Sequence, residues 1–168
     1  MKPLDFHLYL IFNLGLEFYA IDAIFVDKLY RFYEQDDETN FFLFKELDPA
    51  NKKFSLIDLH RTVGAFGFVE KKSATLMTLN AGVIYHEAPV AAIVDYVCGI
   101  EQISPDDMNV LPEHRSRKNG FRPCIRATAM VEVKDSRRHE REVEVKILDH
   151  EAVFMHGIIS DRMLNDLY

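Results

Sequence analysis

The stretch IRATAMVEVKDSRRHEREVEVKIL, residues 125–148, alternates apolar and polar side chains over two separate runs. Apolar residues stand at every second position from Ile125 to Val133, and again from Val143 to Ile147. A period of two is typical of antiparallel strands with one buried face, and the polar segment SRRHER (136–141) between the runs predicts a hairpin turn. Another apolar run, AVFMHGII (152–159), follows a short turn, so we expect a meander of three antiparallel strands.

Residues 81–100, upstream of this meander, are apolar and nearly uncharged. We interpret them as a long buried helix near 85–101, with Pro89 in its first turn, where the missing N–H is not needed. Within APVAAIVDYVCGI (88–100), Asp95 is the one strong acid. A desolvated carboxylate among small side chains suits a general base. The alternative is structural, because such an Asp can also face solvent or cap a neighbouring loop.

The N-terminal third carries a different apolar spacing. Phe18, Ile21, Phe25, Leu29 and Phe32 recur at intervals of three and four, which predicts an amphipathic helix. The polar segment QDDETN (35–40) would end it. We therefore expect a partly helical extension over residues 1–50 and a main domain over 51–168. A helix laid against an antiparallel sheet gives an α+β fold.

Composition narrows the functional classes. The 168 residues carry a formal net charge of −7, and an acidic balance argues against general nucleic-acid binding, which needs many cations. The apolar stretch 8–25 contains Asn13, Glu17 and Asp22, so we expect no membrane span. Two cysteines make no disulfide framework, and reduced thiols favour a cytoplasmic protein.

The segment NAGVIYHEAPVAAIVDYVCG (80–99) resembles the central part of hotdog-fold thioesterases of the phenylacetate-pathway type, in which a loop with Asn and His opens a long helix carrying an acid. The spacing of Asn80, His86 and Asp95 is similar to that family's. The resemblance implies an antiparallel sheet wrapped around the long helix. It also implies an acyl-CoA or acyl-carrier thioester as substrate, hydrolysed at the interface of a homodimer or a dimer of dimers.

The same resemblance assigns roles to residues. Asn80 would orient water or substrate, His86 and Glu87 would lie at the helix start, and Asp95 would be the catalytic acid. The loop around the helix start, with Gly82 and Ala88, would contact the substrate, and no cofactor is implied. Glu87 and Ala88 stand where the family has paired glycines. Either Glu87 has become catalytic or hydrolysis is impaired, in which case the chain is a non-catalytic acyl-binding module.

A basic segment supplies the remaining candidates. RSRKNGFRPCIR (115–126) contains no acid, and such a cluster attracts phosphate-bearing ligands. The hotdog resemblance implies that Arg115, Arg117 and Arg122 would lie near the phosphates of coenzyme A. The segment can also be a solvated basic turn. These arginines loosely resemble the cyclic-dinucleotide motif of PilZ domains, which we keep as a weaker alternative.

Other reactive side chains give weaker signals. His150, Glu151 and His156 lack a spacing that would converge on a metal, so we expect no metal site. We interpret Cys98 as a small core residue, because no base can be assigned to it.

Overall fold

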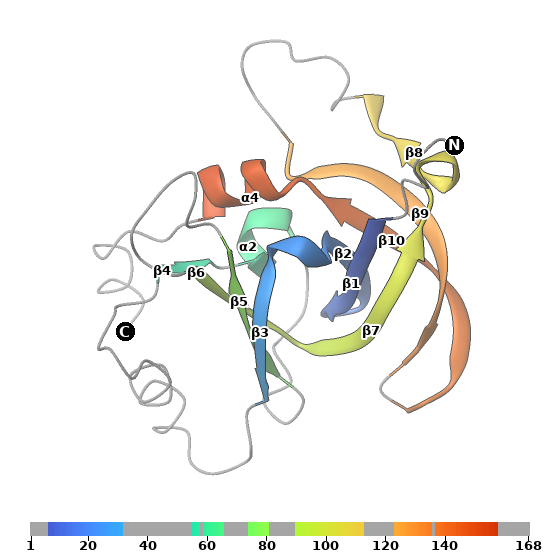
Figure 1. Ribbon diagram of the computed structural model, residues 1–168, viewed down its shortest axis with the longest axis horizontal. Coiled ribbons are helices and arrows are strands. Elements are labelled where there is room, and N and C mark those ends of the chain that lie inside the picture. Colours follow the sequence, from blue (N-terminus) through green and yellow to red (C-terminus); the bar gives the residue numbers. More distant parts are fainter. Residues whose placement is uncertain are drawn as a thin grey trace.

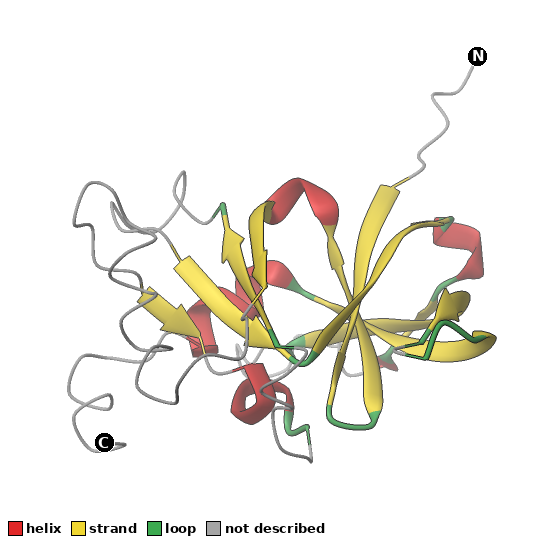
Figure 2. Ribbon diagram, turned by 90° about the horizontal axis from the view of Figure 1, so that it is seen from below, coloured by secondary structure: helices red, strands yellow, loops and turns green. Residues whose placement is uncertain are grey.

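The computed structural model describes residues 7–31, 55–57, 59–65, 74–80, 90–112, 123–135 and 137–157. In this part of the chain the fold is mostly β, with two sheets and short helices (Figures 1 and 2). The six-stranded sheet contains β1 (His7–Leu14), β2 (Glu17–Asp22), β7 (Tyr96–Ile103), β8 (Asn109–Val110), β9 (Ile125–Lys134) and β10 (Glu140–Leu148). The four-stranded sheet contains β3 (Val26–Arg31), β4 (Ser55–Ile57), β5 (Thr75–Leu79) and β6 (Val90–Val94). The helical elements are η1 (Ala23–Phe25), α2 (Leu59–Val63), η2 (Pro105–Asp107) and α4 (His150–Gly157).

The six-stranded sheet has the order β7-β1-β2-β10-β9-β8 and curls strongly, as Figure 1 shows. Its pairs are antiparallel except for β10 with β2, which run parallel. The curl brings β7 into contact with β9, although the two strands are not neighbours in the sheet order. The sheet therefore encloses a core of its own, formed by side chains such as Ile11, Ala129 and Val145.

Strands β1 and β2 are buried on both faces. Ile11 and Ala20 point into the curled sheet, whereas Phe12 and Tyr19 belong to a second core on its other face. That second core is completed by the four-stranded sheet, which has the order β3-β5-β6-β4, and by residues of α2 and α4. Two cores share the β1–β2 pair as a common wall, so this hairpin joins the two parts of the fold.

The expected long helix near 85–101 is wrong. Residues 90–94 and 96–103 are strands β6 and β7, with a bend at Asp95 between them, and no long central helix occurs in the described residues. The reason is burial: Val90, Ala92 and Val94 face one core while Ala91 packs in another cluster. A strand buried on both faces shows no alternation and cannot be distinguished from a buried helix by its apolar pattern.

Two further predictions of local structure are wrong for related reasons. The expected helix through Phe18–Leu29 is replaced by β2, η1 and β3, and the helical N-terminal extension is absent from the described part of the chain. The run expected to be a third strand, AVFMHGII, falls largely in helix α4, where Ala152, Val153 and Phe154 are all buried. An apolar run of this length fits either a strand or a short buried helix.

The hairpin predicted from the opening stretch is confirmed. β9 and β10 pair antiparallel with Val131 opposite Val143, and the alternate side chains of β9 are buried. The turn is organised by Asp135, whose Oδ1 accepts hydrogen bonds from the backbone N–H groups of Arg137 and His139. These bonds, that of His139 first, lower the pKa of the Asp135 carboxyl group.

The expected boundary between residues 1–50 and 51–168 stays a prediction, because residues 32–54 lie outside the described ones. Strands on the two sides of that boundary nevertheless pair with each other. β1 pairs with β7, and β2 pairs with β10.

Candidate functional site

Asp95 occupies the bend between β6 and β7 and is 4% exposed. Its backbone N–H donates to the carbonyl oxygen of Asn13 over 3.1 Å, and its Oδ2 accepts a hydrogen bond from the backbone N–H of Gly15. Gly15 lies in the β1–β2 turn with φ of +62°, a conformation that favours glycine. The turn therefore presents its N–H to the buried carboxylate.

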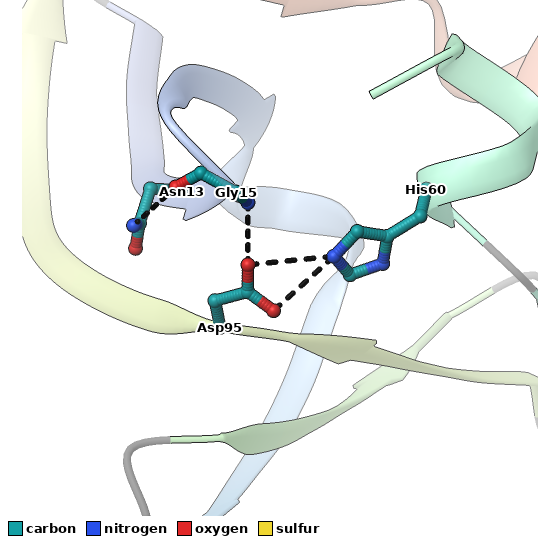
Figure 3. Close-up of polar contacts among 4 residues, drawn as sticks. All are labelled: Asn13, Gly15, His60 and Asp95. Carbon is teal, nitrogen blue, oxygen red and sulfur yellow. Dashed lines mark hydrogen bonds and ion pairs between the residues drawn. The ribbon is translucent and has the colours of Figure 1, made fainter. Parts of the chain in front are cut away.

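His60 approaches the same carboxylate from helix α2. Its Nε2 lies 3.2 Å from Oδ1 and 3.4 Å from Oδ2 of Asp95, as Figure 3 shows. Asn13 adds a hydrogen bond from Nδ2 to the carbonyl oxygen of Gly15 over 3.2 Å, while its buried Oδ1 has no hydrogen-bond partner. We call Asn13, Gly15, His60 and Asp95 the buried polar cluster.

The contacts of the cluster join three segments that are distant in the sequence: the β1–β2 turn, helix α2 and the β6–β7 bend. These contacts give Asp95 a structural role. The catalytic role expected from the sequence stays a prediction. Sequence reasoning identified Asp95 but missed His60, Asn13 and Gly15. The Asn-Leu-Gly sequence at 13–15, between two apolar runs, was a usable signal for a hairpin turn.

The other sequence-derived candidates are not brought to this cluster. Asn80 directly follows β5 and is exposed, and its N–H donates to the carbonyl oxygen of Phe25 over 2.7 Å. Because Leu79 pairs with Val90 at the opposite end of the β5–β6 pair from Asp95, the two candidates lie apart. The remaining candidates fall outside the described residues: Gly82, His86, Glu87, Ala88, Arg115, Arg117 and Arg122.

Three large apolar side chains are exposed on β7, on β1 and on η1, and both β7 and η1 contact β1. Leu8 is 49%, Ile24 73% and Ile100 58% exposed. Ile100 pairs with Leu10, so Ile100, Leu10 and the alternate residue Leu8 share the outer face of the curled sheet. Ile24 lies in η1, which contacts β1. We call Leu8, Ile24 and Ile100 the apolar ledge; no signal in the sequence marks it.

The thiol of Cys98 lies against the core of the curled sheet, as the sequence interpretation expected. Burial raises its pKa to about 11. At pH ~8 only ~0.1% of this thiol would be thiolate, against a tenth or more of an ordinary cysteine with pKa ~8.5. We therefore expect iodoacetamide to alkylate Cys98 at least ~100-fold more slowly in the folded protein than in urea. Peptide mass spectrometry measures both rates, and equal rates would contradict the burial of this side chain.

The described residues contain no group of three or more His, Cys, Asp or Glu side chains placed to hold a metal ion. None of their helices has both the length and the apolar character needed to cross a membrane.

Comparison with known proteins gives a fold but no family. No family model matches the chain, and no curated protein matches it. Among solved structures, the crystal structure of the scaffolding protein TtCheW from Thermoanaerobacter tengcongensis is similar, with a TM-score of 0.58 and 16% sequence identity. The match covers 88% of this chain and 87% of that chain, so the likeness extends over both sheets.

This likeness corrects the resemblance drawn from residues 80–99. The chain has the fold of a CheW scaffolding protein and not the α+β hotdog fold of a thioesterase. The expected acyl-thioester hydrolase activity, the coenzyme A ligand and the hotdog dimer are therefore wrong, as are the acyl-binding and PilZ-like alternatives. The resemblance to thioesterases came from a short motif within residues 80–99, an apolar segment that contains strand β6 and the start of strand β7.

Proposed function

We propose that this protein is a non-enzymatic scaffold that binds protein partners through the apolar ledge. The observation that carries the proposal is the exposure of Leu8 and Ile100, diagonal neighbours on one face of two paired strands, with Ile24 exposed on η1, which contacts β1. Single exposed apolar residues are common on soluble proteins, whereas contiguous apolar patches mark interaction surfaces. The fold supports this proposal, because TtCheW, a protein of similar fold, is a scaffolding protein.

The chemistry of the ledge indicates the kind of partner. Leu8 and Ile100 lie on regular strands, which hold the side chains in place before binding and so reduce the entropy lost on association. We infer that the partner presents an apolar protein surface. We propose that the protein binds this partner in the cytoplasm, a location that the two free thiols favour.

Replacing Leu8 and Ile100 together by Glu should weaken partner binding by about 30-fold or more, because truncating central apolar contacts costs about 2 kcal/mol or more at hot spots. Partners would be identified by proximity labelling in cells and then titrated as purified proteins by calorimetry. Both positions are exposed, so the circular dichroism spectrum should not change.

The matched control is Met130→Glu. Met130 is 55% exposed on β9, opposite Glu144, and does not belong to the ledge. We expect this variant to bind the same partner within about two-fold of wild type, because surface substitutions away from an interface are near-neutral. Equal affinities for wild type and for Leu8→Glu/Ile100→Glu would refute the ledge as the binding surface.

A further inference from the structure

Asp95 is the single residue between β6 and β7, so the chain passes from the four-stranded to the six-stranded sheet at this position. On the six-stranded side, its backbone and carboxylate contact Asn13 and Gly15. On the other side it contacts His60 of α2, the helix that follows β4. The carboxylate therefore bridges the two halves of the fold at the point where the chain crosses between them.

The bridge depends on charge. Both carboxylate oxygens of Asp95 lie within 3.4 Å of Nε2 of His60, an arrangement that attracts most strongly when the imidazole is protonated and the carboxylate is ionised. The side chains are 17% and 6% exposed, so salt and water screen the pair less than a surface pair. Histidine is the side chain whose charge changes near physiological pH.

Other titratable groups lie on the elements that contact or adjoin the pair. Helix α2 itself carries Arg61, and β6 carries no titratable side chain. Helix α4, which packs against α2, contributes His150 and Glu151 and is preceded by Asp149. The adjoining strands add Tyr96 of β7 and Glu17 of β2.

His150 is the second histidine that could respond to pH in this layer. Its ring stacks on Phe25 with centroids 3.7 Å apart. An experiment on pH must therefore separate His60 from His150.

We propose that the Asp95–His60 contact is a pH-sensitive latch that holds α2 and the four-stranded sheet on the six-stranded sheet. The charge on His60 determines the direction of the pH dependence. Protonated His60 strengthens the contact with the Asp95 carboxylate, so the latch is closed on the acidic side of the histidine titration. As the pH rises and His60 loses its proton, the ionic part of the contact is lost and α2 opens more often.

Hydrogen exchange of individual amides tests the latch. The reporters are the N–H groups of Gly15 and Ala65, which donate to the Asp95 carboxylate and to the carbonyl oxygen of His60. A reference is the β9–β10 hairpin, for example Val143. Between about pH 5.5 and about pH 8.5 we expect the protection factors of the reporters to fall by about ten-fold or more, the equivalent of one charged hydrogen bond, while that of Val143 stays constant.

Three variants show which side chain causes the pH-dependent change in protection. His60→Gln keeps a hydrogen-bond donor without the charge, so its reporters should have low protection that does not change with pH. Asp95→Asn keeps the shape and an acceptor for Gly15 and should give the same flat profile. His150→Gln should keep the full wild-type response.

Three outcomes overturn the latch: a constant reporter protection in the wild type, an undiminished pH response in His60→Gln, or loss of the response in His150→Gln. A fall in the protection of Val143 equal to that of the reporters would also overturn it, because it would show global unfolding. If Asp95→Asn does not fold, the comparison of wild type with His60→Gln and His150→Gln still decides.

Discussion

Replacing Phe12 by Ala should lower the free energy of unfolding by about 3–5 kcal/mol, the range for large-to-small changes of a buried aromatic side chain. Phe12 is fully buried and stacks on Tyr19 with ring centroids 6.2 Å apart. It lies on β1, the strand shared by the two cores, so the cavity cannot close without moving a strand that supports both sheets. Urea unfolding followed by circular dichroism measures the loss.

The control for this variant is Leu16→Ala. Leu16 lies in the β1–β2 turn, two positions beyond the end of β1, and is 93% exposed. Its truncation should change the free energy of unfolding by less than about 0.5 kcal/mol. A cost below about 1 kcal/mol for Phe12→Ala would contradict the position of this ring in the core between the sheets.

The sequence predicted the part of the fold in which burial is one-sided. In β9, Val131 and Val133 face the core while Met130 and Glu132 face solvent. The alternation of apolar and polar residues in the sequence shows this difference directly. The turn was predictable as well, because a polar segment separates the two runs and Asp135 organises it through local hydrogen bonds.

The shared wall of the fold could not be predicted in the same way. Phe18 and Ile21 suggest one helical face when their spacing is considered alone, but in β2 they point into different cores. Which apolar residue faces which core depends on the presence of the second sheet, and that sheet is assembled from residues distant in the sequence, such as Leu29 with Met77. Local patterning does not contain this long-range information.

The candidate site could likewise be predicted only in part from the sequence. Asp95 stands out in the sequence as an acid in an apolar run, and the structure confirms that it is buried. Its partners His60 and Gly15 come from a helix and a turn elsewhere in the chain, so their proximity is a property of the topology. The ledge is harder to predict from the sequence than the polar cluster. Leu8 and Ile100 have no unusual sequence context, and only the pairing of β1 with β7 places them on the same face.

Asp95→Ala should lower the free energy of unfolding by about 3–5 kcal/mol, the cost of removing one partner from a buried ion pair. The truncation removes the acceptor of the Gly15 N–H and the carboxylate beside the His60 imidazole, in a region that water barely reaches. A buried donor left unpaired carries a desolvation cost that a lost surface contact does not. The measurement is urea unfolding near pH ~5.5, where the imidazole is charged, beside Glu140→Ala as a control.

The control removes a carboxylate from an exposed ion pair, so it tests whether burial is the cause of the cost. Oε1 of Glu140 lies 3.8 Å from Nζ of Lys134. These side chains are 62% and 66% exposed, so the loss of this pair should cost less than about 1 kcal/mol, as is usual for surface pairs. Equal costs for the two variants would mean that Asp95 is hydrated in solution, and neither the polar cluster nor the latch could then hold the two sheets together.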